Sequence, residues 1–165
     1  MSSDDLRFMG LANEEARKSN CVRRGVGAVI VRKGEVLAAG CNGVSGVYRD
    51  CREAGCPRCI NGGATGAGYE QCVCIHAEQR AIAEAAARGV STKDSVLYVN
   101  LRPCLQCLAI ARAAGVLGIV FDEDWTYPGE FERTYRALAA EFDLFEHVGG
   151  CERKEPSPAA AEILP

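Results

Sequence analysis

The chain has 165 residues, of which 48% are hydrophobic and 25% are charged, and its net charge is −3. This length predicts one globular domain, and the charge gives no general attraction to nucleic acid. No stretch approaches the roughly 20 apolar residues of a membrane helix, and the acidic start is unlike a secretory signal. We therefore expect a cytoplasmic protein without membrane or polynucleotide partners, in which clusters among the 10 cysteines bind metal rather than form disulfides.

The spacing of apolar residues predicts alternating helices and strands. In chain order we expect a helix at 4–18, strands at 26–31 and 36–39 joined by a Lys33-Gly34 turn, a helix at 76–88, a strand at 96–100, a helix at 104–114, a strand at 116–121, a helix at 130–142 and a strand at 144–148. This order predicts a three-layer α/β fold. The last helix is long enough for a right-handed crossover, so the last strand should run parallel to its neighbour.

The Gly- and Cys-rich segment 41–73 shows no sustained period. So long a loop is improbable in a compact domain unless something functional holds it. We expect one domain over 1–149, with a Cys-rich insertion at 41–74, followed by a flexible tail at 150–165.

Two short motifs carry the chemistry: His76-Ala77-Glu78 and Pro103-Cys104-Leu105-Gln106-Cys107. They supply one imidazole, two thiolates and a carboxylate that need not bind metal. Three protein ligands with a fourth position left to water are typical of catalytic zinc. Cys104 and Cys107 are three residues apart, so both sulfurs project from one face of a first helical turn. This H-x-E…P-C-x-x-C pattern is the signature of zinc-dependent nucleobase deaminases.

Glu78 is the expected catalytic residue. Zinc can lower the pKa of bound water toward about 7. We expect Glu78 to take a proton from this water, to deliver it to the ring nitrogen beside the amino-bearing carbon, and then to protonate the departing ammonia. This double role requires a carboxyl pKa near neutrality, which an apolar pocket can provide.

Each motif alone has an ordinary explanation. A single His on a helix is more often structural, and one C-x-x-C can be a redox pair or half of a zinc ribbon. A ribbon that paired Cys56 and Cys59 with Cys104 and Cys107 would far exceed the roughly 15–20 residues usual between such knuckles. The two motifs together favour chemistry.

Four further runs carry a resemblance to a known family: Ser19 to Val31, Gly40 to Gly43, Gly55 to Cys59, and Cys72 to Glu78. With the catalytic motifs they resemble deoxycytidylate (dCMP) deaminases, from about residue 4 to residue 148. The resemblance implies a cytidine-deaminase-like three-layer α/β/α sandwich with a five-stranded mixed sheet. It also implies conversion of dCMP and water to dUMP and ammonia.

The same resemblance implies substrate contacts and partners. Asn42 would contact the nucleotide, and the base would be walled by Val26, Gly27, Ala28 and Ala77. Members of this family form homo-oligomers, often hexamers, so we expect an assembly between dimer and hexamer. Many respond to dCTP and dTTP, which makes a Mg²⁺–nucleotide effector a possibility here.

Three residues depart from the family pattern and become candidate substrate contacts. Arg80 stands where Asn is usual, Trp125 where Tyr is usual, and Arg102 where a smaller or acidic residue is usual. They could change the phosphate contacts, the tolerated base substituent or the allosteric response. Arg80 could equally be an outward helix residue paired with Glu84.

A second group of cysteines crowds the insertion. Four thiolates close the coordination sphere of a structural zinc, and such an ion can fix a segment that has no core of its own. Related enzymes often carry one. The candidates are Cys21, Cys51, Cys56, Cys59, Cys72 and Cys74, and the sequence does not select four of the six. The alternative is a set of reduced, buried thiols; Cys41 and Cys151 are interpreted as free cysteines.

The sequence leaves other functions open. The same reaction could act on a cytidine, a modified cytosine nucleotide or a natural-product intermediate, as Arg80 and Trp125 suggest. A different class is a zinc-stabilised module that binds a protein partner. Glu78 argues against that class, because a structural zinc site has no use for an additional carboxylate that is not a ligand.

Overall fold

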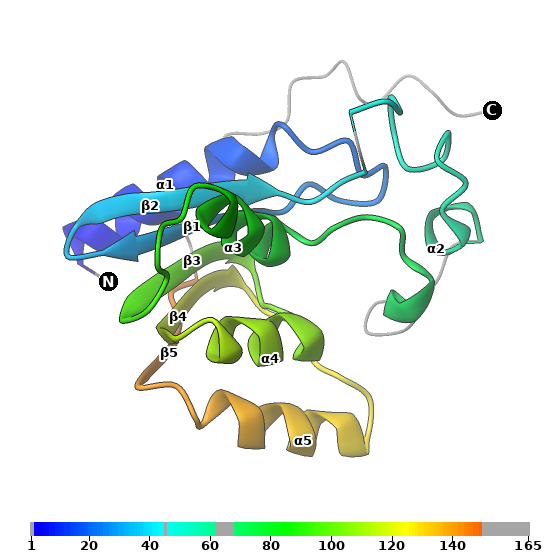
Figure 1. Cartoon of the computed structure of the whole chain (residues 1–165). Helices are drawn as coiled ribbons and strands as arrows, with labels where there is room; N and C mark the ends of the chain where they lie inside the picture. Colours follow the sequence, from blue (N-terminus) through cyan, green and yellow to red (C-terminus); the bar gives the residue numbers. More distant parts are fainter. Residues whose placement is uncertain (1, 45, 62–67, 150–165) are drawn as a thin grey trace.

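The computed structural model describes residues 2–44, 46–61 and 68–149, and Figure 1 shows the arrangement of their elements. Five strands form one sheet in the order β2-β1-β3-β4-β5. Their bounds are β1 Gly27–Arg32, β2 Glu35–Cys41, β3 Ser95–Leu101, β4 Val116–Glu123 and β5 Leu144–His147. β1 is antiparallel to β2 and β3, whereas β4 is parallel to β3 and β5. The predicted parallel last strand is confirmed.

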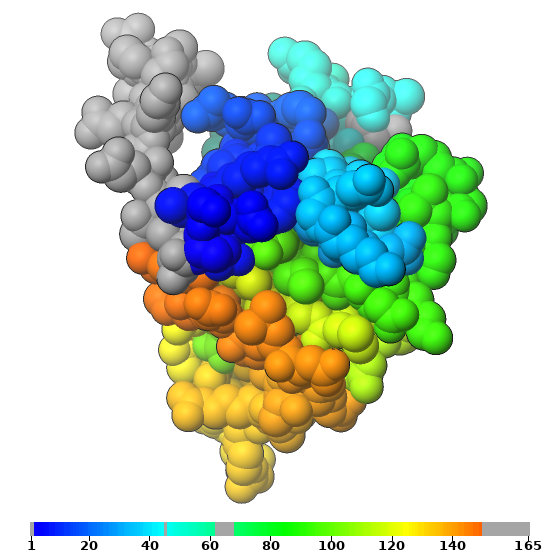
Figure 2. All heavy atoms as spheres, turned by 90° about the vertical axis from the view of Figure 1, so that its left-hand side faces the viewer, coloured from blue at the N-terminus to red at the C-terminus, as the bar shows by residue number. Residues whose placement is uncertain are grey.

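Helices cover both faces of this sheet. Their bounds are α1 Ser3–Ala16, α3 Ala77–Ala87, α4 Leu105–Ala113 and α5 Glu130–Ala139. Figure 1 places α1 on one side of the sheet and the other three helices on the opposite side. Figure 2 shows α1, in dark blue, beside the lighter blue surface of the β1–β2 hairpin. The predicted three-layer α/β/α sandwich with a five-stranded mixed sheet is confirmed.

The alternation of side chains along the strands fills two cores. On the α1 face, Phe8 and Met9 pack against Val29 and Tyr98. The larger core lies under α3, α4 and α5 and includes Leu108. Residues of the central strands are buried on both faces, which is usual for strands covered by helices on both sides and explains their continuous apolar runs.

Local signals set the element boundaries. Ser2 caps α1 by accepting the Asp5 N–H, and Asp5 in turn accepts the Ser2 N–H. Lys33 and Gly34 both have positive φ, 51° and 81°, as expected for a two-residue hairpin turn. The helices mostly end before their predicted ends: α5, for example, stops at Ala139 rather than at 142.

The insertion between β2 and α3 holds two short elements, α2 at Pro57–Ile60 and the 3-10 turn η1 at Tyr69–Gln71. Its described residues pack around buried cysteines rather than on the main core. The expected tail at 150–165 lies outside the described residues. Within the described part of the chain, the helices lack the length and apolar character needed to cross a bilayer.

Gly40 allows α3 to approach the sheet. A Cβ at this position of β2 would lie 2.6 Å from the Ala81 backbone nitrogen and 2.9 Å from the Ala77 carbonyl oxygen. Both atoms belong to α3, the helix that follows His76. The missing side chain therefore fixes how deeply this helix sits against β2.

We predict that Gly40→Ala lowers the free energy of unfolding by about 1–3 kcal/mol, because α3 must move away from β2. Gly10→Ala is the matched control. Gly10 lies within α1 with no atom near the added methyl group, so alanine should stabilise by up to about 1 kcal/mol there. Urea unfolding measures both changes. Equal stability of the two variants would contradict this account of Gly40.

Candidate active site

Two helix N-termini meet at the predicted motifs. His76 is the N-cap of α3, and its N–H donates to Gln79 Oε1 at 3.0 Å. The preceding residue, Ile75, forms a two-bond bridge with Gly43, which fixes the chain before the helix. Cys104 is the N-cap of α4, just beyond the end of β3. The positive ends of both helix dipoles therefore face the same region and favour thiolates there.

The three predicted ligands lie close enough to share one ion. His76 Nδ1 is 3.5 Å from Cys104 Sγ and 3.4 Å from Cys107 Sγ. Two atoms on one tetrahedral zinc, at usual Zn–N and Zn–S lengths, would be about 3.6 Å apart. All three donor atoms lie within 4.8 Å of one another. The donor set and its spacing fit zinc.

The charges of these groups depend on one another. A hydrogen bond with Cys107, together with the nearby His76, lowers the pKa of the Cys104 thiol to about 4. Burial opposes protonation of His76, but hydrogen bonds to Cys104 and Cys72 outweigh it and raise the pKa of His76 to about 10. Cys104 and His76 thus favour a thiolate beside a protonated imidazole; a metal ion would bind the thiolate directly and would displace the imidazole proton.

Glu78 lies beside these ligands and is almost fully buried, with 4% of its surface exposed. Burial, with the nearby Cys104 thiolate, raises the pKa of Glu78 to about 7. A carboxyl group in this range can both accept and return a proton near neutrality.

A pocket of about 290 Å³ opens over these groups. This is a small ligand pocket, suited to one flat ring with its substituents. Among the residues predicted for the catalytic zinc, catalysis and substrate contact, the pocket is lined by Val26, Asn42, His76, Ala77, Glu78, Arg102, Cys104 and Trp125. The structure therefore brings most of the predicted substrate contacts together around the predicted metal ligands.

Three predicted substrate contacts lie elsewhere. Gly27 and Ala28 are in β1, behind the lining residues, and the Gly27 N–H donates to Asn100 Oδ1 at 3.0 Å. The Arg80 guanidinium donates to the carbonyls of Cys41, at 2.7 Å, and Gly43, at 3.0 Å. Arg80 thereby holds the two residues that flank Asn42, instead of pairing with Glu84.

Asn42 itself is held by its surroundings. Its Oδ1 accepts the Ser19 hydroxyl at 2.6 Å and the Val26 N–H at 2.8 Å, and its Nδ2 donates to the Arg24 carbonyl at 2.9 Å. These bonds join the segment after α1 to the end of β2. The Asn42 side chain therefore shapes the rim of the pocket as well as facing it.

Six lining residues were not among the predicted contacts: Arg23, Arg24, Arg58, Tyr69, Leu101 and Asp124. The Arg58 guanidinium lies 4.3 Å from the Tyr69 ring centroid, and Arg24 pairs with Glu123. A signal existed for the arginines, because Arg23 and Arg24 lie between Cys21 and Val26, and Arg58 between Cys56 and Cys59. No pattern in the sequence indicated Tyr69.

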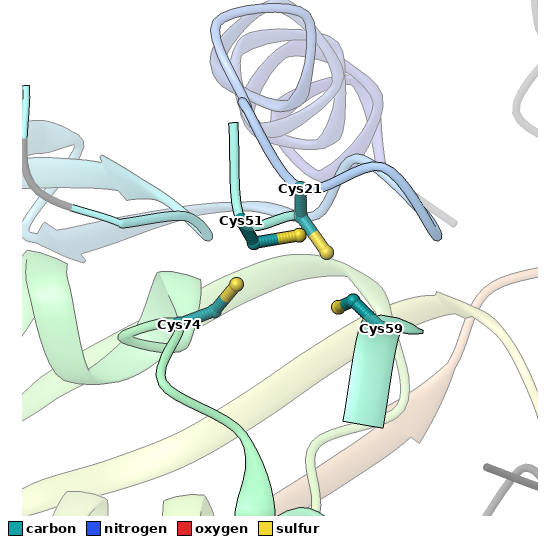
Figure 3. A group of neighbouring side chains, drawn as sticks. All are labelled: Cys21, Cys51, Cys59 and Cys74. Atoms are coloured by element: carbon teal, nitrogen blue, oxygen red, sulfur yellow. The ribbon is translucent and has the colours of Figure 1, made fainter. Parts of the chain in front are cut away.

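Four of the six cysteines predicted for a second zinc site also lie close together. The sulfur atoms of Cys21, Cys51, Cys59 and Cys74 lie within 4.8 Å of one another. In Figure 3 they point toward a common centre from four separate segments of the chain. A hydrogen bond with Cys74 lowers the pKa of the Cys21 thiol to about 5. Of the six candidates, Cys56 and Cys72 lie outside this set.

Cys72 connects the two thiol groups. Hydrogen bonds to Cys74 and then to His76 lower the pKa of the Cys72 thiol to about 3. Cys21, Cys72 and Cys74 all line the pocket together with His76. The four-sulfur group is thus directly adjacent to the candidate active site.

The fold and the His–Cys–Cys site with its neighbouring carboxylate define the class of zinc-dependent nucleobase deaminases. The sequence model for the cytidine and deoxycytidylate deaminase zinc-binding region matches residues 2–123. The chain belongs to the cytidine and deoxycytidylate deaminase family.

Several relatives are named deoxycytidylate deaminase. One from Schizosaccharomyces pombe is 38% identical over 117 residues, which are 71% of this chain and 36% of that protein. One from Mycobacterium phage D29 is 31% identical over 125 residues, which are 73% of this chain and 94% of that protein. The chain thus spans little more than a third of the yeast protein, but nearly all of the phage protein.

Solved structures share the fold. The dCMP deaminase of cyanophage S-TIM5 has a TM-score of 0.64 and 22% identity, over 88% of this chain and 99% of that one. That phage protein has also been solved in complex with dCMP and dUMP. At this identity the likeness establishes the common fold alone.

We predict that Cys104→Ser and His76→Ala each remove one zinc per chain, because two remaining ligands hold the ion much more weakly than three. Cys41→Ser is the control: Cys41 ends β2 outside both ligand groups and should retain full metal content. Elemental analysis after gel filtration measures the ratio. Full zinc retention in both ligand variants would contradict the assigned site.

Proposed function

We propose that this protein deaminates a cytosine nucleotide hydrolytically with zinc, and that its substrate is dCMP, converted with water to dUMP and ammonia. The observation that carries the proposal is the buried Glu78 beside three donor atoms spaced for one zinc. The names of the relatives from yeast and phage D29 support the substrate. We extend the proposal to a single deaminase domain over residues 1–149.

The chain's own residues account for the steps. His76, Cys104 and Cys107 would hold the zinc, which when bound supplies a Lewis acid that makes water nucleophilic at neutral pH. Glu78 takes a proton from the attacking water and delivers it to the ring nitrogen beside the amino-bearing carbon. Once the oxygen of the water has bonded to the amino-bearing carbon, the same carboxylate takes the remaining proton of the new hydroxyl group and passes it to the amino group. The C–N bond then breaks, the carbonyl forms and ammonia leaves. Ala77 and Val26 provide apolar lining beside these groups.

The charge of the pocket supports a nucleotide over a nucleoside. Arginines outnumber carboxylates in its lining, and Arg23, Arg24 and Arg58 come from neighbouring parts of the rim. Guanidinium groups bind phosphate well, because several of their N–H groups can face one anion. Nucleosides lack the group that these arginines would bind, so cytidine is the weaker alternative.

We also propose that Cys21, Cys51, Cys59 and Cys74 bind a second, structural zinc. Their spacing and burial support four-thiolate coordination, which leaves no place for water. An ion there would fix the insertion that carries Arg58 and Tyr69 against the pocket. A zinc-stabilised module without activity remains the alternative, and the position of Glu78 disfavours it.

Other expectations stay predictions: a cytoplasmic location, a homo-oligomer between dimer and hexamer, and a Mg²⁺–nucleotide effector. A cytoplasmic location is consistent with the proposed cysteine ligands, because a reducing compartment keeps cysteines available for metal. Among the described residues, Val47 and Ile60 of the insertion are large exposed apolar side chains, 81% and 58% exposed. Such residues are compatible with an assembly but do not specify it.

We predict that Glu78→Gln keeps the catalytic zinc but lowers kcat at least about 100-fold, because glutamine cannot carry the proton. Ammonia release from dCMP, CMP, deoxycytidine, cytidine and guanine measures the activity, and dCMP should give the highest kcat/KM. Glu84→Gln is the control on the same helix: Glu84 pairs with exposed Arg88 and should leave activity unchanged. Wild-type turnover by Glu78→Gln would exclude the mechanism.

We predict two zincs per chain in the wild-type protein, and one in Cys51→Ser and Cys59→Ser, because each removes a ligand of the four-sulfur group. Cys72→Ser and Cys41→Ser should retain both ions, since neither sulfur belongs to that group. Elemental analysis gives the number. One zinc per chain in the wild-type protein would remove the structural site and leave the catalytic proposal intact.

A further inference from the structure

We propose that Arg102 and Glu132 are positioning residues: the ion pair of buried Arg102 with the partly buried Glu132 holds Trp125 as a rigid wall of the pocket, against which the substrate base stacks. The stacking part rests on the proposed function. The positioning of Trp125 by this ion pair is supported by contacts within the chain alone. Arg102 would then act on the substrate through the position of the indole and not by direct contact.

The guanidinium of Arg102 is enclosed by protein groups. Only 7% of this residue is exposed, and its Nη2 donates to Glu132 Oε1 at 2.9 Å. Its Nη1 lies 3.4 Å from Asp124 Oδ1 and donates to the Trp125 carbonyl. The Tyr135 ring lies below it, with 3.8 Å between Cζ and the ring centroid. A guanidinium in such surroundings needs these partners, because an unpaired buried charge is strongly destabilising to the folded state.

Trp125 is held at two points by the same residue. Arg102 Nη1 binds the Trp125 carbonyl, and the indole Nε1 donates to the Arg102 carbonyl at 2.7 Å. The first bond fixes the backbone of the loop after β4, and the second fixes the rotation of the indole. A side chain held in this way presents one face to the pocket without loss of rotamer freedom on binding.

Glu132 extends the hold to the metal side of the site. Its second oxygen, Oε2, accepts the Tyr127 N–H at 3.1 Å. The Tyr127 hydroxyl in turn accepts the Leu105 N–H at 3.0 Å, at the residue directly after Cys104. The carboxylate therefore orders a loop that touches both the pocket wall and the first turn of α4.

The held indole belongs to a continuous aromatic surface. The Trp125 ring centroid is 6.1 Å from that of Tyr69, and Tyr69 is 5.6 Å from the His76 ring in an edge-to-face arrangement. Trp125 and Tyr69 both line the pocket. A flat heterocycle placed by the metal ligands would gain stacking from this surface. Displacement of the indole should therefore weaken substrate binding more than it slows the proton transfers.

The test uses the one tryptophan of the chain, whose fluorescence reports on this wall alone. In the zinc-loaded protein, Arg102→Met and Glu132→Gln should shift the emission to longer wavelength and increase quenching by acrylamide. KM for dCMP should rise about tenfold, while kcat changes much less and zinc content stays unchanged. Arg112→Met is the control, because Arg112 forms a looser, exposed pair with Glu141 at 3.9 Å.

A double-variant comparison distinguishes positioning of Trp125 by Arg102 from direct contact between Arg102 and the substrate. In a Trp125→Leu background, Arg102→Met should no longer raise KM, because the wall that it positions is gone. An equal rise in both backgrounds would overturn the proposal in favour of direct substrate contact by Arg102. Unchanged emission and quenching in Glu132→Gln would overturn it as well. If cytosine nucleotides are not turned over, the proposed function fails, yet the fluorescence still decides whether the pair holds the indole.

Discussion

The convergence of two helix N-termini is the constraint on which the rest of this structure depends. α3 begins after His76 and α4 begins after Cys104, so the backbone ends of both helices place a ligand at the same point. Gly40 allows α3 to lie against β2, and the parallel pairing of β3 with β4 aligns the strand that leads to α4. A metal site built from such rigid elements needs little local ordering when the ion binds.

Part of the pocket lining comes from the insertion, which packs separately from the main core. Arg58 and Tyr69 belong to the insertion, whose described residues are organised around buried cysteines. Cys72 lies between the four-sulfur group and His76. Trp125, which lies beside Tyr69 in the pocket lining, is held by different groups: Arg102, its partner Glu132 and the Arg102 carbonyl. The two aromatic residues of this surface therefore depend on different surroundings: Tyr69 on the Cys-rich insertion, and Trp125 on the Arg102–Glu132 pair.

The sequence predicted the elements and the metal ligands because both depend on local patterns. The spacing of apolar residues and the continuous apolar runs predicted all five strands. Two short motifs predicted the metal ligands His76, Cys104 and Cys107. It could not select four of the six cysteines, since selection depends on how 41–74 folds back on Cys21. The role of Arg80 also depended on tertiary structure: its acceptors are backbone carbonyls from β2 and the following turn, which no side-chain pattern reports.

The central claim is that His76, Cys104 and Cys107 hold one zinc ion beside Glu78. Anomalous scattering at the zinc edge from crystals of the purified protein tests it most directly. We expect an anomalous peak for one zinc ion at about 2.0–2.3 Å from His76 Nδ1 and from both cysteine sulfurs. The Glu78 carboxylate should lie next to this ion without being one of its protein ligands. A metal-loaded crystal with no peak at this position, or with zinc bound through Glu78 in place of one sulfur, would contradict the account.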